Sequence, residues 1–129
     1  MITLKQYNDY CRSLPATTHV NQWGGADVWK VGGKVFAIGG WSKEEKPYIT
    51  FKCSEISYEM LKEQDGLRPA PYLASRGFKW IQQYQDPGLT KKELFSYIEA
   101  SHMMIAAKLT KKLQKELGLE QLVERYKQQ

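Results

Sequence analysis

The chain has 129 residues, of which 42% are hydrophobic and 26% are charged. These fractions are typical of a soluble folded domain and exclude a disordered chain, and no apolar run approaches the roughly 18 residues that a membrane-spanning helix needs. A net charge of +5 and a pI near 9.1 allow attraction to nucleic acid or to an anionic surface. Two distant cysteines, Cys11 and Cys53, and an N-terminus unlike a signal peptide favour a cytoplasmic location.

Helical spacing of apolar residues predicts a first helix over Thr3–Leu14, with Thr3 and Gln6 as a capping box and Pro15 as its end. A short strand is expected at 19–23, before a Gly-Gly break.

A hairpin is predicted over Val28–Trp41, where two runs of β-branched and aromatic residues are joined by Gly32–Gly33. Both loop residues need φ > 0, which glycine adopts without strain. With this loop, Trp29 lies opposite Phe36, and alternation gives the hairpin two faces. The bulkier face, expected to be buried, carries Trp29, Val31, Phe36 and Ile38; the smaller face carries Val28, Lys30, Val35 and Ala37. The tip, with Lys34, is either a basic wing that touches a polyanion or an ordinary solvated turn.

A charged loop at Ser42–Pro47 leads to a strand at 48–53, and Ser54 is the expected N-cap of a helix that runs to about Gln64. The apolar stripe of this helix is Ile56, Met60 and Leu61. Two prolines are expected to exclude regular structure from 67–72, a turn or short helical piece follows at 73–77, and a further strand is expected at 78–84.

The longest helix is expected from Thr90 to Leu117, because Thr90 and Glu93 form a capping box and Gly118 ends the pattern. Its last turns carry four lysines, whose position the helix dipole explains: Lys108, Lys111, Lys112 and Lys115. Residues 1–118 form the predicted domain. Residues 119–129 form a short amphipathic helix, which packs either on the domain or on a second subunit as a homodimer.

This order of elements predicts an α+β fold, an antiparallel sheet covered on one face by helices. The chain lacks the chemistry of an enzyme or a metal protein. Its histidines are His19 and His102, and adjacent Ser101 and His102 on one helix do not face each other. No metal-ligand motif or phosphate loop occurs, so no catalytic residue, metal or cofactor is expected.

Several blocks of the sequence resemble the MmcQ/YjbR family in their order and spacing. The hairpin at 28–37 is followed by 48–53, Leu67-Arg68-Pro69-Ala70-Pro71-Tyr72, Lys79-Trp80-Ile81 and the helix end at 107–112, so the resemblance extends to about Leu117. The resemblance implies a CyaY-like (frataxin-like) α+β fold and a small bacterial protein of the kind usually described as DNA-binding, with a double-wing arrangement of hairpins. In place of the family's usual Ser-Tyr, this chain has Ser101-His102.

The leading hypothesis is therefore a non-enzymatic domain that binds DNA weakly and in a salt-sensitive way. The residues expected to contact phosphates are Lys30, Lys34, Lys52, Arg68, Arg76 and Lys79. The alternative is a protein-interaction or small-ligand module. Its shallow pocket or docking surface would be formed by the small-residue face of the hairpin and the outer face of Tyr48, Thr50 and Lys52. Iron binding, which the frataxin-like fold suggests, is rejected because the first helix offers Asp9 but also Lys5 and Arg12.

Overall fold

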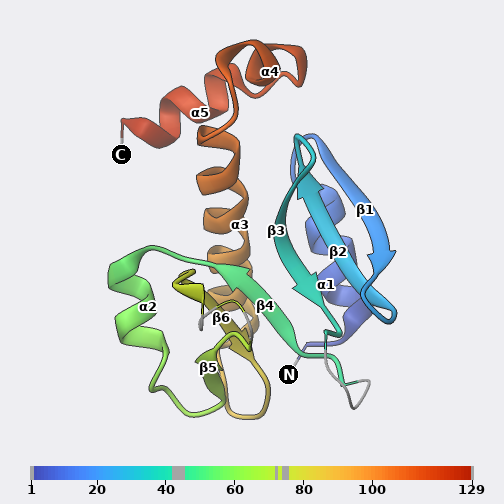
Figure 1. Ribbon diagram of the computed structural model, residues 1–129, viewed down its shortest axis with the longest axis vertical. Helices are drawn as coiled ribbons and strands as arrows, with labels where there is room; N and C mark the ends of the chain where they lie inside the picture. The colour runs from blue at the N-terminus through green and yellow to red at the C-terminus, as the bar shows by residue number, and fades with distance from the viewer. Residues whose placement is uncertain (1, 42–45, 72, 74–75, 129) are drawn as a thin grey trace.

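An antiparallel sheet organises the chain in the computed structural model, which describes residues 2–41, 46–71, 73 and 76–128. Over these residues the sheet has six strands in the order β1-β2-β3-β4-β6-β5 (Figure 1). The strands are β1 (Thr17–Gln22), β2 (Ala26–Val31), β3 (Lys34–Gly39), β4 (Ile49–Lys52), β5 (Leu67–Pro69) and β6 (Trp80–Gln83). The helices are α1 (Leu4–Ser13), α2 (Glu55–Leu61), α3 (Lys91–Ala107), α4 (Lys111–Glu116) and α5 (Glu120–Lys127). The predicted α+β fold is confirmed.

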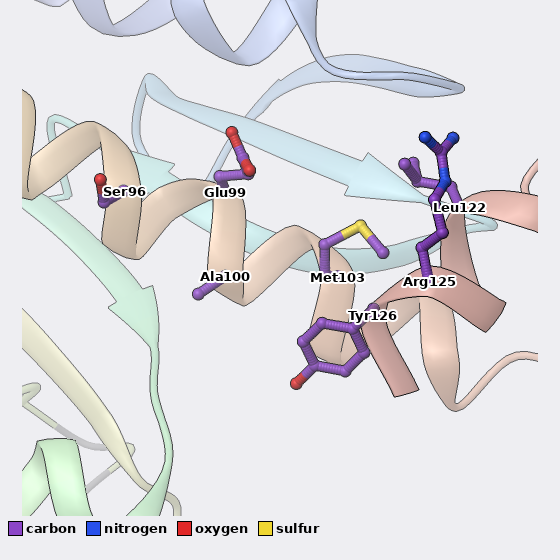
Figure 2. A pocket seen from close by; sticks show the side chains of 7 residues that line it. All are labelled: Ser96, Glu99, Ala100, Met103, Leu122, Arg125 and Tyr126. Carbon is purple, nitrogen blue, oxygen red and sulfur yellow. The ribbon is translucent and has the colours of Figure 1, made fainter. Parts of the chain in front are cut away.

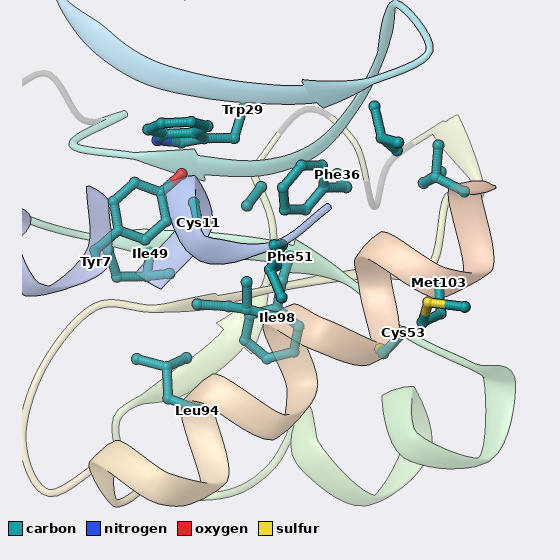
Figure 3. Packing of buried hydrophobic residues seen from close by; sticks show 14 of the residues in the cluster. Tyr7, Cys11, Trp29, Phe36, Ile49, Phe51, Cys53, Leu94, Ile98 and Met103 are labelled. Carbon is teal, nitrogen blue, oxygen red and sulfur yellow. The ribbon is translucent and has the colours of Figure 1, made fainter. Parts of the chain in front are cut away.

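The main core lies between the sheet and the helices. Tyr7 of α1, Phe36 and Phe51 of the sheet and Ile98 of α3 are fully buried in it (Figure 3). Each such side chain stabilises the fold by about 1.5–3 kcal/mol. The predicted capping boxes are present at Thr3 of α1 and at Thr90 of α3.

A β-bulge changes the predicted register of the hairpin. Near the Gly32–Gly33 turn, Lys30 pairs with Val35 as predicted, but Trp29 pairs with Ala37 instead of Phe36. Phe36 is the extra residue of the bulge, so Phe36 and Ala37 both belong to the main core. Ile38, predicted beside Trp29, instead lies on the opposite side of the sheet.

That opposite side, called the outer face below, is also buried in its centre. Val28 and Ile38 form a second cluster there with Ala26, Ala70 and Trp80. Val28 and Thr50 are 0% exposed. The centre of the small-residue face is therefore not a pocket, because Ala70 and Trp80 pack there with Val28.

Edge strand β5 was not predicted, because prolines were expected to exclude regular structure. Arg68 pairs with Gln82, and Pro69 pairs with Ile81 of β6. An edge strand accommodates proline, since one side of such a strand needs no ladder donor.

Helix α2 exposes two of its three predicted core residues. Leu61 is buried, but Ile56 is 75% exposed and Met60 is 61% exposed. Periodicity identified the apolar positions of this helix but placed its buried side wrongly.

The long C-terminal helix is interrupted. Helix α3 ends at Ala107, and Thr110 caps a separate helix α4, with its side chain accepting from the Leu113 N–H. Lys111 and Lys112 therefore lie in the first turn of a helix, where the dipole disfavours cations. The dipole explanation of these two lysines is wrong.

Helix α5 packs against α3, with Leu119 and Val123 buried in the main core. Within the described chain, no helix is long and apolar enough to cross a membrane. Most of the predicted loop Ser42–Pro47 and part of the predicted turn at 73–77 lie outside the described residues.

Candidate functional site

Four of the six residues predicted to bind phosphates lie at one end of the sheet. Lys34 follows the Gly32–Gly33 turn, and Lys30 pairs with Val35 beside it. Strand β4 runs antiparallel to β3, so Lys52 at its last position lies at the same end. Lys52 pairs with Trp80, which places neighbouring Lys79 there as well.

A fifth cation, Lys108, joins this group through the end of α3. The pKa of Lys52 is lowered, first by partial burial and then by the positive charge of Lys108. Among the residues that the structure describes, no carboxylate pairs with Lys30, Lys34, Lys52 or Lys108. We use the name hairpin end for Lys30, Lys34, Lys52, Lys108 and the Gly32–Gly33 turn, without Lys79.

The turn is held on α3 by a close contact at glycine. Gly32 has a φ of 59°, and a Cβ built on it would lie 2.6 Å from Cδ1 of Leu109. Leu109 is buried directly after Lys108. The absence of a side chain at Gly32 thus lets the hairpin and the end of α3 approach each other. Figure 1 shows the β2–β3 turn at the same end of the molecule as α4.

The other predicted cations have different surroundings. The Lys79 ammonium lies 4.8 Å from the centre of the Tyr58 ring, which leaves it at the border of the hairpin end. Arg76 is exposed in the irregular segment before β6. Arg68 lies in the middle of β5, and its Nε and Nη2 donate to Oε1 of Gln82 at 3.0 and 2.7 Å. The six predicted residues therefore do not form a single patch.

The residues missed by the sequence reasoning are Lys108, Lys111 and Lys112. The sequence places these lysines in the last turns of one long helix, where the helix dipole alone explains their positive charge. The usable signal was Thr110, because a threonine before a short helical segment is a typical N-cap.

The potentially reactive side chains are buried and engaged. Burial raises the pKa of Cys53 to about 11 and raises the pKa of Cys11 further, so neither is a thiolate at neutral pH. Ser101 donates to the Phe36 carbonyl at 2.6 Å and accepts from the Lys52 N–H at 3.1 Å. These bonds tie α3 to β3 and β4.

Both histidines also have structural partners. His102 is buried, and its Nε2 donates to the Pro15 carbonyl at 2.8 Å. Burial lowers its pKa, so the ring is neutral. His19 lies on β1, with Nε2 2.8 Å from Oδ1 of Asp27. No group of three metal-ligating side chains occurs within the described part of the chain.

A small cleft of about 280 Å³ lies between α3 and α5 (Figure 2). Its lining residues are Ser96, Glu99, Ala100, Met103, Leu122, Arg125 and Tyr126. Glu99 already accepts a hydrogen bond from the Tyr10 hydroxyl at 3.1 Å. The volume is below the range of about 300–1,000 Å³ that is usual for small-molecule sites.

The sheet with helices on one face defines an α+β protein of the kind that the sequence blocks predicted. The chain belongs to the YjbR family, because the sequence profile of that family matches residues 12–104. The crystal structure of Deinococcus radiodurans protein DR2400, a DUF419 domain, is similar in fold, with a TM-score of 0.77 over 92% of this chain and 90% of that chain at 22% identity. No curated protein matches the chain. The expected family is confirmed, and the matched residues end before Lys108.

Proposed function

We propose that this protein binds DNA through its hairpin end, by contacts between lysines and phosphates. The observation that carries the proposal is the position of Lys52, whose pKa is lowered by partial burial and by the nearby positive charge of Lys108, with no carboxylate paired to either lysine among the described residues. A structure that holds cations together in this way gains by binding an anion.

The lysines of the hairpin end come from separate elements, which suits a polyanion with regularly spaced phosphates. Lys30 and Lys34 come from the hairpin, Lys52 from β4 and Lys108 from the end of α3. Lys111 and Lys112 follow at the start of α4. Because a lysine ammonium is a point charge on a flexible chain and lacks the rigid fork of arginine, the expected binding is largely independent of sequence.

Fluorescence polarisation with a labelled duplex tests the proposal. For about four phosphate contacts, affinity should fall roughly 100-fold between about 50 and 200 mM salt. Lys34→Glu should weaken binding and reduce the slope of log K against log salt by about 0.9, the effect of one lost contact.

Lys92→Glu is the matched control, because it makes the same charge change at the other end of α3, about 24 Å from Lys108 by the helical rise. Lys92 is exposed in the first turn of α3. Absence of duplex binding by the unaltered protein at low salt refutes the proposal. Equal losses in Lys34→Glu and Lys92→Glu remove the hairpin end from it and leave only general charge attraction.

A small-ligand or protein-interaction module is the second candidate. The centre of the outer face is buried, so among the described residues the cleft between α3 and α5 is the feature that favours this candidate. Its small volume and the engaged carboxylate of Glu99 make it the weaker of the two.

A further inference from the structure

Trp23 is an unusual residue at the end of the sheet away from the hairpin end. It lies in the turn between β1 and β2 with a φ of 54°, a left-handed conformation that is rare for a bulky residue. Its side chain is 51% exposed, and its ring contacts the ring of Trp41 with 5.7 Å between centroids. A large ring is thus kept at the surface by a backbone conformation that glycine would adopt with less strain. Such positions often serve function.

A second aromatic group lies on the same outer face. The Arg68 guanidinium lies 4.4 Å from the centre of the Tyr84 ring and 5.7 Å from that of Tyr48. The two tyrosine rings meet edge to face at 6.3 Å. Tyr48, Tyr84 and Arg68 are all partly exposed, so their surfaces remain accessible to a ligand.

Gln82 connects the two groups. Its Oε1 accepts from Arg68, while its Nε2 donates to the Trp41 carbonyl at 3.3 Å and lies 3.2 Å from the Thr50 hydroxyl. Gln82 is buried, so it fixes the guanidinium and the backbone of Trp41 relative to each other. The five residues Trp23, Trp41, Tyr48, Arg68 and Tyr84 are called the aromatic platform below.

We propose that the aromatic platform binds single-stranded nucleic acid by stacking unpaired bases on its rings, with Arg68 contacting the backbone. This inference rests on the proposed function and specifies the form of the nucleic acid. Proteins that bind single strands combine aromatic faces for bases with cations for phosphates. Bases within a duplex are stacked on each other, so only an unpaired strand offers its faces to these rings.

The composition of the platform favours this ligand over an apolar protein partner. The platform presents four aromatic rings and one guanidinium, which are the groups that single-strand binders use. Arg68 gives Gln82 only its Nε and Nη2, and within the described residues Nη1 has no hydrogen-bond partner. That nitrogen is left to donate to a phosphate of the bound strand.

Two polyanions that differ only in their bases test the proposal. One is an oligothymidylate of about 15 nucleotides, at the upper end of the usual size of single-strand sites. The other is an abasic deoxyribose phosphate strand of the same length. Polarisation should show at least about fivefold tighter binding of the oligothymidylate, because one stacked base contributes about that factor or more.

Three variants locate the effect. Trp23→Gly removes the ring and relaxes the backbone, so the protein stays folded while the preference for the oligothymidylate falls toward one. Trp23→Tyr, which keeps a ring at this position, restores most of the preference. Lys34→Glu weakens both strands equally and leaves the preference unchanged, because the hairpin end contacts phosphates and not bases.

The outcomes separate the two proposals. Equal binding of both strands by the unaltered protein overturns the platform and leaves the hairpin end intact. An undiminished preference in Trp23→Gly also overturns it, since Trp23 carries the most exposed ring of the platform. Absence of binding to these strands and to duplex at low salt overturns the proposed function, and this inference with it.

Discussion

The contact between the hairpin and α3 makes a sharp prediction about two adjacent glycines. Gly32→Ala should destabilise the protein more than Gly33→Ala. Both positions have a positive φ, at 59° and 80°, so each alanine costs about 1–2 kcal/mol in the left-handed region. Only at Gly32 does the new methyl group meet another side chain, with Cδ1 and Cδ2 of Leu109 at 2.6 and 2.8 Å.

Relief of that overlap needs a shift of a buried leucine, which costs about 1–3 kcal/mol more. The expected loss in the free energy of unfolding is therefore about 2–5 kcal/mol for Gly32→Ala and about 1–2 kcal/mol for Gly33→Ala. Urea denaturation followed by circular dichroism measures both values. Equal losses would show that the hairpin does not rest on Leu109.

A double-mutant cycle gives an independent check. Leu109→Ala alone should cost about 2–5 kcal/mol through the cavity that it leaves. In the double variant, the new methyl group of Gly32→Ala enters the vacated space. The loss of unfolding free energy in the double variant should therefore be smaller than the sum of the two single losses. Strict additivity would refute the contact even if Gly32→Ala alone is destabilising.

Two further predictions concern the buried polar residues of α3. Ser101→Ala should reduce the free energy of unfolding by about 1–3 kcal/mol, because it leaves the Phe36 carbonyl and the Lys52 N–H without a partner. Urea denaturation measures this loss, and a value under half of that range would contradict the role of Ser101 as a link between α3 and the sheet. Burial lowers the pKa of His102, so below pH of about 6.5 the unfolded chain binds a proton that the folded protein does not, and stability should fall as the pH drops until it passes the folded pKa. His102→Gln, whose amide can still donate to the Pro15 carbonyl, should remove this part of the pH dependence. If the variant keeps the same difference in stability between pH of about 7.5 and 5.5, groups other than His102 cause that difference.

The sequence predicted the helices, the sheet and the main hairpin because these depend on local signals. The Gly32–Gly33 turn and the Thr90 capping box each need only a few neighbouring residues. The bulge at Phe36 could not be predicted, since the extra residue is accommodated only when β2, β3 and α3 pack together. The wrong side was chosen for α2 for a similar reason, because only tertiary packing leaves Ile56 and Met60 at the surface.

The candidate surfaces were predicted less completely than the fold. Lys30, Lys34 and Lys52 were identified by their charge, but charge alone did not show that Arg68 is held among tyrosines on the outer face. In the sequence a helix dipole accounts for Lys108, whereas its grouping with Lys52 depends on where α3 ends against the sheet. Positions in space, and not residue types, decided which cations belong together.

Three residues that break local rules lie at or near the two proposed surfaces. Lys52 is partly buried near another cation, Lys111 begins a helix at the wrong end for its charge, and Trp23 adopts a glycine conformation. Each choice lowers stability relative to a simple alternative. Natural proteins tend to accept such costs where a ligand later offsets them. For this reason the hairpin end and the aromatic platform, and not the cleft between α3 and α5, are the surfaces at which a ligand is expected.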